Sequence, residues 1–179
     1  AEKFYLEALG IGNEGIMAKN LESIYKPGSR VGYGVKIKPI LEKLDLVIVR
    51  AEYGEGKRAG WLSSYTVACY DKKKEKLLDL GKVSTGAKEI EQEGGITFEE
   101  ITKMLKPSIK ETNGKEVVVE PKIIIEVAYE EIQKSTEYSS GYALRFPRII
   151  TVRYDKPIRE INTIVEIEKI YDEQRGRDK

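Results

Sequence analysis

A short basic pattern near the N-terminus has the residue types and spacing to bind a phosphate. Lys36 and Lys38 flank Ile37, so a strand over these residues would place both ammonium groups on one face. Two parallel ammonium groups suit a phosphate, and Arg30 adds a guanidinium that completes an anion clamp. Glu14 is a candidate ligand for a divalent metal ion. The alternative is that the lysine pair lies on a solvated edge strand, which is common in a chain with 34% charged residues.

A glycine-rich loop over residues 54–64 is a second candidate for binding, because it combines three glycines with Lys57, Arg58 and Trp61. An exposed loop of this composition can approach a DNA backbone closely and contact phosphates without reading the base sequence. The alternative is that Trp61 anchors the loop in the core while Lys57 and Arg58 belong to a solvated turn. The lysine run at residues 72–74 is predicted to be a simple charged turn.

The composition limits the class of protein. With 179 residues the chain can form one good core, or one domain plus a piece of another. Lys and Arg number 31 against 30 Asp and Glu, so any nucleic-acid contact must come from a local patch. The single cysteine and the lack of histidine exclude an internal disulfide and the usual zinc ligand sets, which favours a reducing, cytoplasmic compartment. We expect a soluble chain without a membrane span or signal peptide. Abundant Lys, Glu and Ile are typical of thermophile proteins.

The order of predicted elements indicates a mainly β fold. The N-terminal forty residues should hold a short helix over residues 2–9 and two strands, at residues 16–18 and around the lysine pair. Apolar and β-branched runs then predict three strands, a capped helix ended by Pro107, and two more strands: 44–51, 64–70, 76–83, helix 98–105, 116–120 and 122–129. Three strands, a helix and two strands are the ingredients of a five-stranded barrel of the OB type, which commonly carries nucleic acid on one face.

A C-terminal helix is expected after the barrel. Asp155 is the predicted N-cap, with Pro157 in the first turn. An apolar stripe should then face the barrel: Ile158, Ile161, Ile164, Val165 and Tyr171.

Taken together, the motifs of the chain resemble a known enzyme family. In chain order they are EGIMAK at residues 14–19, YKPGSR at 25–30, VKIKP at 35–39, GEGKRAGWLSSY at 54–65 and LRFPR at 144–148. This series resembles the C-terminal part of ATP-dependent DNA ligases, most closely those of archaea, and it covers nearly the whole chain. One departure is Tyr33, where many relatives place a tryptophan shortly before the lysine pair. The preference for ATP over another nucleotide donor therefore stays open.

The resemblance implies a three-step reaction. An enzyme lysine takes AMP from ATP, the AMP moves to the 5′-phosphate at a nick, and the adjacent 3′-hydroxyl attacks to seal it. The expected cofactors are ATP and Mg²⁺, and the expected partners are nicked double-stranded DNA and the upstream domains of the same polypeptide, in a monomer. Such enzymes serve DNA replication, repair and recombination.

The resemblance also implies roles for single residues in two groups. In the first, Glu14 lies near the divalent ion, and nucleotide contacts come from Lys19, Arg30, Lys36 and Lys38.

The second group lies near the C-terminus and resembles the last motif of the family: Arg145, Arg148, Arg153, Asp155 and Lys156. Guanidinium forks can bind the pyrophosphate leaving group through paired hydrogen bonds. That role requires the barrel to close over ATP and later to swing towards DNA. Without the family, this segment would be interpreted as a basic edge strand and a helix cap.

The predicted domain organisation follows from the same elements. Residues 1–40 contain too few strands for a domain and are interpreted as the end of an adenylation domain, while residues 41–179 form the OB-fold domain with its C-terminal helix. The Lys-x-Asp-Gly motif of the nucleophilic lysine does not occur in this sequence, so the chain alone should be unable to take AMP from ATP.

Two other function classes stay open. RNA ligases and capping guanylyltransferases are the first, although the loop over residues 54–64 and the Arg-Phe-Pro-Arg run argue against them. The second is a non-catalytic OB-fold module that binds single-stranded nucleic acid. Such a module would present aromatic stacking platforms in a basic groove and would not need residues 14–38.

Overall fold

The computed structural model describes residues 1–11, 13, 15–24, 26–27, 32–37, 43–89 and 95–175. The chain forms two compact units, one of residues 1–40 and 173–179 and one of residues 41–172. Within the described residues, no helix has both the length and the apolar content that a bilayer span requires.

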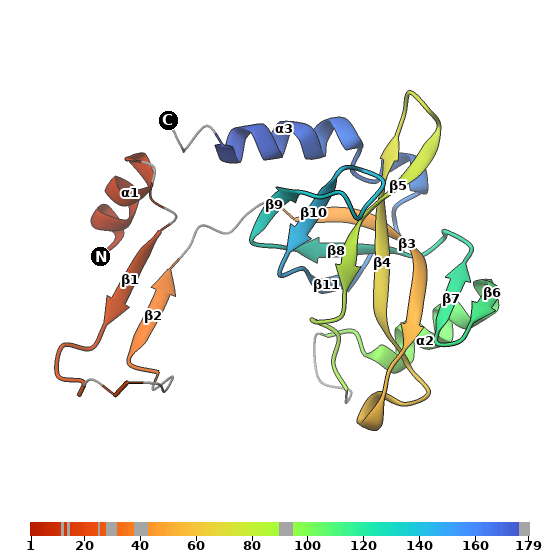
Figure 1. Cartoon of the computed structure of the whole chain (residues 1–179), viewed down its shortest axis with the longest axis horizontal. Coiled ribbons are helices and arrows are strands. Elements are labelled where there is room, and N and C mark those ends of the chain that lie inside the picture. The colour runs from red at the N-terminus through yellow and green to blue at the C-terminus, as the bar shows by residue number, and fades with distance from the viewer. Residues whose placement is uncertain are drawn as a thin grey trace. The chain divides into compact units, whose positions relative to one another are not determined.

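The first unit contains one helix and one hairpin (Figure 1). Helix α1 spans Glu2–Gly10, and strand β1, Ile16–Lys19, pairs antiparallel with β2, Gly34–Ile37. These elements confirm the helix and strands predicted here. On α1, Ala8 is buried, while Phe4 and Leu6 are more than half exposed. Within this unit, the described apolar side chains therefore lack a common core.

The second unit is built on a curved antiparallel sheet. Its path runs in the order β11-β8-β3-β4-β5, with β7 beside the second half of β3 and β6 beside β7. The strands are β3, Leu44–Tyr53; β4, Leu62–Asp71; β5, Lys76–Val83; β6, Ile109–Asn113; β7, Glu116–Val119; β8, Ile124–Ala128; and β11, Arg148–Val152. A separate hairpin pairs β9, Glu131–Lys134, with β10, Tyr142–Arg145.

The two ends of this five-strand path meet just beyond β5. The Ile149 N–H of β11 donates to the Thr85 carbonyl at 2.8 Å, and the Thr85 hydroxyl donates to the Pro147 carbonyl at 2.9 Å. Gly86 makes this approach possible: its φ is +101°, and a Cβ there would lie 2.1 Å from the Ile149 carbonyl oxygen. The sheet therefore closes on itself as a barrel, which confirms the mainly β fold predicted from the sequence (Figure 1). The identity of the strands differs in one place, because β11 completes the closed path while the predicted strand 116–120 lies off it as β7.

Helix α2, Phe98–Leu105, lies between the third and fourth predicted strands, as expected. The Thr97 hydroxyl accepts the Glu100 N–H at 3.1 Å, and the Glu100 carboxylate accepts the Thr97 N–H at 2.8 Å. This capping box is the one that the sequence predicts. Ile101 and Leu105 are fully buried, so the helix adds one apolar face to the barrel core.

The C-terminal helix begins later than predicted, and the assignment of Asp155 as its N-cap is wrong. Helix α3 spans Ile164–Arg175, and Thr163 and Glu166 form its capping box: the Thr163 N–H donates to the Glu166 carboxylate at 2.6 Å. Asp155 lies in a turn, where Arg153 binds its carboxylate. A short 3-10 helix, Ile158–Glu160, occupies the region between them.

The predicted apolar stripe is therefore only partly correct. Ile161, Ile167 and Tyr171 are buried, whereas Val165 is 58% exposed. Ile158 and Ile161 precede α3, so they are not part of its apolar face. They pack with a second buried cluster that contains Val47, Ala68 and Ile124.

Candidate functional site

In the first unit, two of the predicted nucleotide contacts lie on one face of the β1–β2 hairpin. Lys19 pairs with Gly34, and Met17 pairs with Lys36. Residues directly opposite each other share a face of an antiparallel pair, as do alternate residues of one strand. A Cβ on Gly34 would lie 3.6 Å from the Lys19 Cγ and 3.9 Å from the Met17 Sδ, so these side chains extend over that glycine. Lys19 and Lys36 thus form an exposed basic face.

The other predicted residues of this group, Glu14, Arg30 and Lys38, lie outside the described residues, and their roles stay predictions. In the described ranges, no three or more Asp, Glu, Cys or His side chains gather as a metal site would require.

In the second unit, the strongest electrostatic feature surrounds Arg153, directly after β11. Its Nη1 lies 3.1 Å from both carboxylate oxygens of Asp45, and its Nε and Nη2 each lie 3.0 Å from an oxygen of Asp155. The hydrogen bonds to Asp155 first, and the negative charge of Asp45 second, raise the pKa of Arg153. The hydrogen bonds from Arg153 lower the pKa of Asp155 to about 2. One guanidinium therefore bridges two carboxylates.

Asp45 also binds a second predicted site residue, because the Lys156 ammonium donates to its Oδ2. On the other side, the Lys43 ammonium donates to Glu126 at 2.6 Å, and Glu126 lies 3.8 Å from Arg153. We call this set of three cations and three carboxylates the charge cluster: Lys43, Arg153, Lys156, Asp45, Glu126 and Asp155.

Sequence reasoning missed Asp45 and Glu126. The available signal was Asp45 itself, a carboxylate inside the apolar run of β3 that must find a partner when buried. The partner's identity was not available, since Arg153 lies 108 residues away in the chain.

The two arginines of the Arg-Phe-Pro-Arg run lie at the other end of β11. The Arg145 guanidinium is 3.0 Å from the Glu131 carboxylate and 5.3 Å from the centroid of the Phe146 ring. Phe146 has a φ of +49° and is 66% exposed. Arg148 is exposed and forms no ion pair with any residue that the structure describes. This end of the strand presents one paired arginine, one unpaired arginine and an aromatic ring.

The five residues of the last motif therefore form two groups. Arg148 begins β11 and Arg153 follows its last residue, so the strand separates them by roughly 16 Å. The sequence placed these residues in one predicted pyrophosphate-binding motif and did not indicate that the strand separates them.

In the glycine-rich loop, one predicted DNA-binding residue, Arg58, is held by neighbouring side chains, and the other, Lys57, has no ion-pair partner among the described residues. Lys57 and Arg58 lie in a 3-10 helix, Gly56–Arg58. The Arg58 Nε is 2.8 Å from the Glu89 carboxylate, and its guanidinium lies 4.5 Å from the centroid of the Phe98 ring. Trp61 packs against the core while half-buried. Lys57 is exposed and has no ion-pair partner among the described residues.

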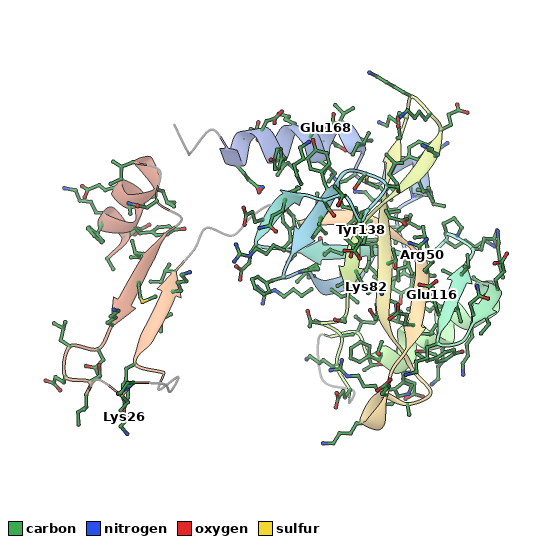
Figure 2. All side chains as sticks on the ribbon, in the orientation of Figure 1. Lys26, Arg50, Lys82, Glu116, Tyr138 and Glu168 are labelled. Carbon is green, nitrogen blue, oxygen red and sulfur yellow. The ribbon has the colours of Figure 1, made fainter. Side chains whose placement is uncertain are left out.

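Two other cations of the barrel surface are neutralised by neighbouring strands. Arg50 lies 2.5 Å from Asp79 and 4.0 Å from Glu116, and Lys82 lies 2.5 Å from Glu52. Figure 2 shows Arg50, Lys82 and Glu116 on the strands β3, β5 and β7. These cross-strand pairs leave little net charge on this face, so the unpaired cations elsewhere are better candidates for binding an anion.

Comparison with known protein families gives a match over more than half of the chain. The family described as "ATP dependent DNA ligase C terminal region" matches residues 58–156. A DNA ligase of Nanoarchaeum equitans (strain Kin4-M) is 57% identical over 177 residues, which are 98% of this chain and 31% of that protein. A DNA ligase of Methanocaldococcus jannaschii is 50% identical over 177 residues, which are 99% of this chain and 30% of that protein. The chain thus spans 30–31% of the length of these curated relatives.

Solved structures confirm the fold. The chain named "Pmar-Lig_Pre." matches with a TM-score of 0.60 and 24% identity, over 87% of this chain and 31% of that one. A mycobacterial DNA ligase D complexed with ATP and MES matches with a TM-score of 0.52 and 23% identity, over 90% of this chain and 50% of that one. At such identities the likeness concerns the fold alone.

Proposed function

The chain belongs to the family of ATP-dependent DNA ligase C-terminal regions, and from this premise we propose that it is the C-terminal part of an enzyme that seals nicks in duplex DNA. The observation that carries the proposal is the family match over residues 58–156, which includes the arginines at both ends of β11. The complete enzyme acts through a lysyl-AMP and a DNA-adenylate intermediate. We propose that this enzyme serves the replication, repair and recombination of DNA. It is proposed to act in the cytoplasm and as a monomer.

The first unit is proposed to be the end of the adenylation domain. Most of the exposed large apolar side chains of the described residues lie there: Phe4, Leu6, Ile11, Met17, Leu21, Ile24, Tyr33, Val35 and Ile37. An apolar surface of this extent normally packs against other protein. The remaining part of an adenylation domain, carrying the nucleophilic lysine, is the partner that the family supplies. The second unit, by contrast, has the buried core expected of an OB-fold domain.

The basic face of Lys19 and Lys36 is proposed to bind the nucleotide, with Arg30 and Lys38 as further contacts. Two exposed ammonium groups on one face of a hairpin suit the phosphates of ATP. Magnesium, held by Glu14 with phosphate and water, would neutralise part of the phosphate charge. The lysines of this chain orient the phosphates for attack by the upstream lysine.

Arg145, Arg148, Arg153 and Lys156 are proposed to stabilise the pyrophosphate leaving group. When the lysine nitrogen attacks the α-phosphorus, the bond to the bridging oxygen breaks and negative charge develops on pyrophosphate. Arg148 is available for this charge, whereas Arg145 and Arg153 must exchange a carboxylate for a phosphate oxygen. Asp155 then serves as the group that orients Arg153.

DNA contact by the second unit is proposed to use Lys57 and Arg58, with nicked duplex DNA as the partner. Lys57 offers an exposed charge, while Arg58 is held by Glu89 and by the Phe98 ring. Such contacts contribute affinity without sequence preference.

Nick sealing in trans tests this function. The chain is added to a separately purified upstream fragment that carries the nucleophilic lysine, with ATP, magnesium and nicked duplex DNA. We expect formation of lysyl-AMP to require this chain, and Arg148→Ala to slow it about 100-fold, as for the loss of one group that stabilises transition-state charge. Lys72→Ala, at the exposed turn after β4, is the matched control and should leave the rate unchanged. If sealing never depends on the chain, yet the chain binds single strands unaided, it is a binding module instead.

A further inference from the structure

We propose that Asp45 competes with pyrophosphate for Arg153 and Lys156, and that this competition weakens product binding and promotes release of the leaving group. The inference rests on the proposed function, because it takes these two cations as pyrophosphate ligands. It adds a residue of β3 that none of the predicted motifs contains.

In this structure the carboxylate of Asp45 occupies both cations. The Asp45 residue is 8% exposed, and both of its carboxylate oxygens lie 3.1 Å from the Arg153 Nη1. One of these oxygens also accepts a hydrogen bond from the Lys156 ammonium. In this state, the cations that a phosphate needs are already bound to a buried carboxylate. A phosphate oxygen that takes the N–H donors now facing Asp45 must displace its carboxylate from them.

The carboxylates of the charge cluster differ in their exposure to water. The Asp155 side chain is 68% exposed, and the Glu126 carboxylate lies 3.8 Å from Arg153, beyond hydrogen-bond distance. The Asp45 side chain is only 10% exposed and binds both cations. An ion pair shielded from water is screened less than an exposed one, and Asp45 binds both cations whereas Asp155 binds Arg153, so Asp45 is the carboxylate that competes with phosphate for the two cations together.

The Asp45 backbone is held independently of its carboxylate: its N–H donates to the Asn162 Oδ1 at 2.7 Å, and its carbonyl accepts the Asn162 N–H at 3.0 Å. Asp45 is also paired with Glu126 in the ladder between β3 and β8. Substitution of the carboxylate by an amide should therefore preserve the strand, and Asp45→Asn changes the charge with little change of shape.

The charge balance gives the expected direction. Lys43, Arg153 and Lys156 face three carboxylates, so the charge cluster is neutral when all six groups are ionised. Asp45→Asn leaves one excess positive charge and frees the two cations from their main competitor. Pyrophosphate should bind the variant more tightly and should leave it more slowly.

The test measures binding of inorganic pyrophosphate to the whole chain by isothermal titration calorimetry at low ionic strength, where charge effects are least screened. We expect Asp45→Asn to bind about five- to tenfold more tightly than the unsubstituted chain, in line with removal of a partly shielded charge pair. Glu52→Gln is the matched control, because it removes another lysine-paired carboxylate from the same strand. It should leave the affinity unchanged. Equal affinities for all three chains, or no binding to any of them, overturn the proposal.

A second measurement covers the case in which Asp45→Asn fails to fold. In the unsubstituted chain, pyrophosphate should shift the NMR resonances of the Arg153 Nε and of the Asp45 carboxyl carbon together, because one ligand replaces the other. An Arg153 shift without an Asp45 shift would contradict the exchange. Sealing in trans that succeeds while Asp45→Asn leaves pyrophosphate affinity unchanged refutes only this inference. Failure of sealing alone refutes the proposed function.

Discussion

The two units of this chain carry predicted site residues on very different foundations. In the first unit, Lys19 and Lys36 lie on a two-stranded hairpin whose strands are almost entirely exposed. In the second, Arg148 and Arg153 flank a strand of a closed barrel with a continuous core. An isolated hairpin of two strands is marginally stable in water, whereas a closed sheet holds its strand ends in place. One group of predicted site residues therefore lies on a hairpin without a core of described residues beneath it, and the other lies on a strand that the barrel holds in place.

Removing one apolar side chain from each unit tests whether both units have a core, and it has the largest expected effect. Leu46→Ala, at a fully buried position of β3, should lower the free energy of unfolding by roughly 2–5 kcal/mol because it leaves a cavity in the core. Phe4→Ala, at a side chain that is 65% exposed, should change it by less than about 0.5 kcal/mol. Urea titration followed by far-UV circular dichroism measures both. A large loss for Phe4→Ala would show that the first unit has a core of its own.

Alanine substitution at one glycine of each unit tests how tightly the backbone of that unit is packed. Gly86→Ala should destabilise the second unit by on the order of 3 kcal/mol, since its Cβ would meet the Ile149 backbone and its φ is positive. Gly10→Ala, at the end of α1 with nothing within 4 Å of the added atom, should be neutral or stabilise by about 0.5 kcal/mol. The fluorescence of Trp61 during denaturation follows the second unit specifically. Unchanged unfolding of Gly86→Ala would contradict the closure of the barrel at this contact.

Local patterns in the sequence were sufficient for much of the barrel. The strands around residues 44–51, 64–70 and 76–83 were predicted because each is an apolar run long enough to be recognised without its neighbours. The capping box at Thr97 was predicted because its four residues bond only to one another. The same pattern occurs at Thr163 and Glu166, whereas the prediction placed the helix start at Asp155, whose carboxylate binds Arg153 instead of capping the helix.

Elements defined by distant partners were not predictable in this way. Strand β6 is mostly exposed and polar, and it exists because β7 supplies its hydrogen bonds. The hairpin of β9 and β10 was likewise not assigned. At the site, the motif identified Arg153 and Lys156, but not Asp45, whose pairing depends on how β3 and β11 are brought together through β8. Sequence spacing cannot measure such a contact.

The smallest expected effect is on the pH dependence of thermal stability, when one ion pair is removed from each unit. The hydrogen bonds from Arg153 lower the pKa of Asp155 from 3.8 to about 2 in the folded chain. A folded-state pKa below the unfolded one means that this pair stabilises the fold above about pH 3.8 and loses its effect as pH falls towards 2. Asp155→Asn should therefore lower the thermal midpoint slightly at pH 6, and the difference from the unsubstituted chain should vanish near pH 2. Glu7→Gln removes the exposed pair in α1, where Lys3 and Glu7 are 4.0 Å apart, and should leave the pH profile unchanged. Circular dichroism melts between pH 2 and pH 6 measure these thermal midpoints. A pH-independent difference between Asp155→Asn and the unsubstituted chain would mean that the bonds from Asp155 to Arg153 do not persist in solution.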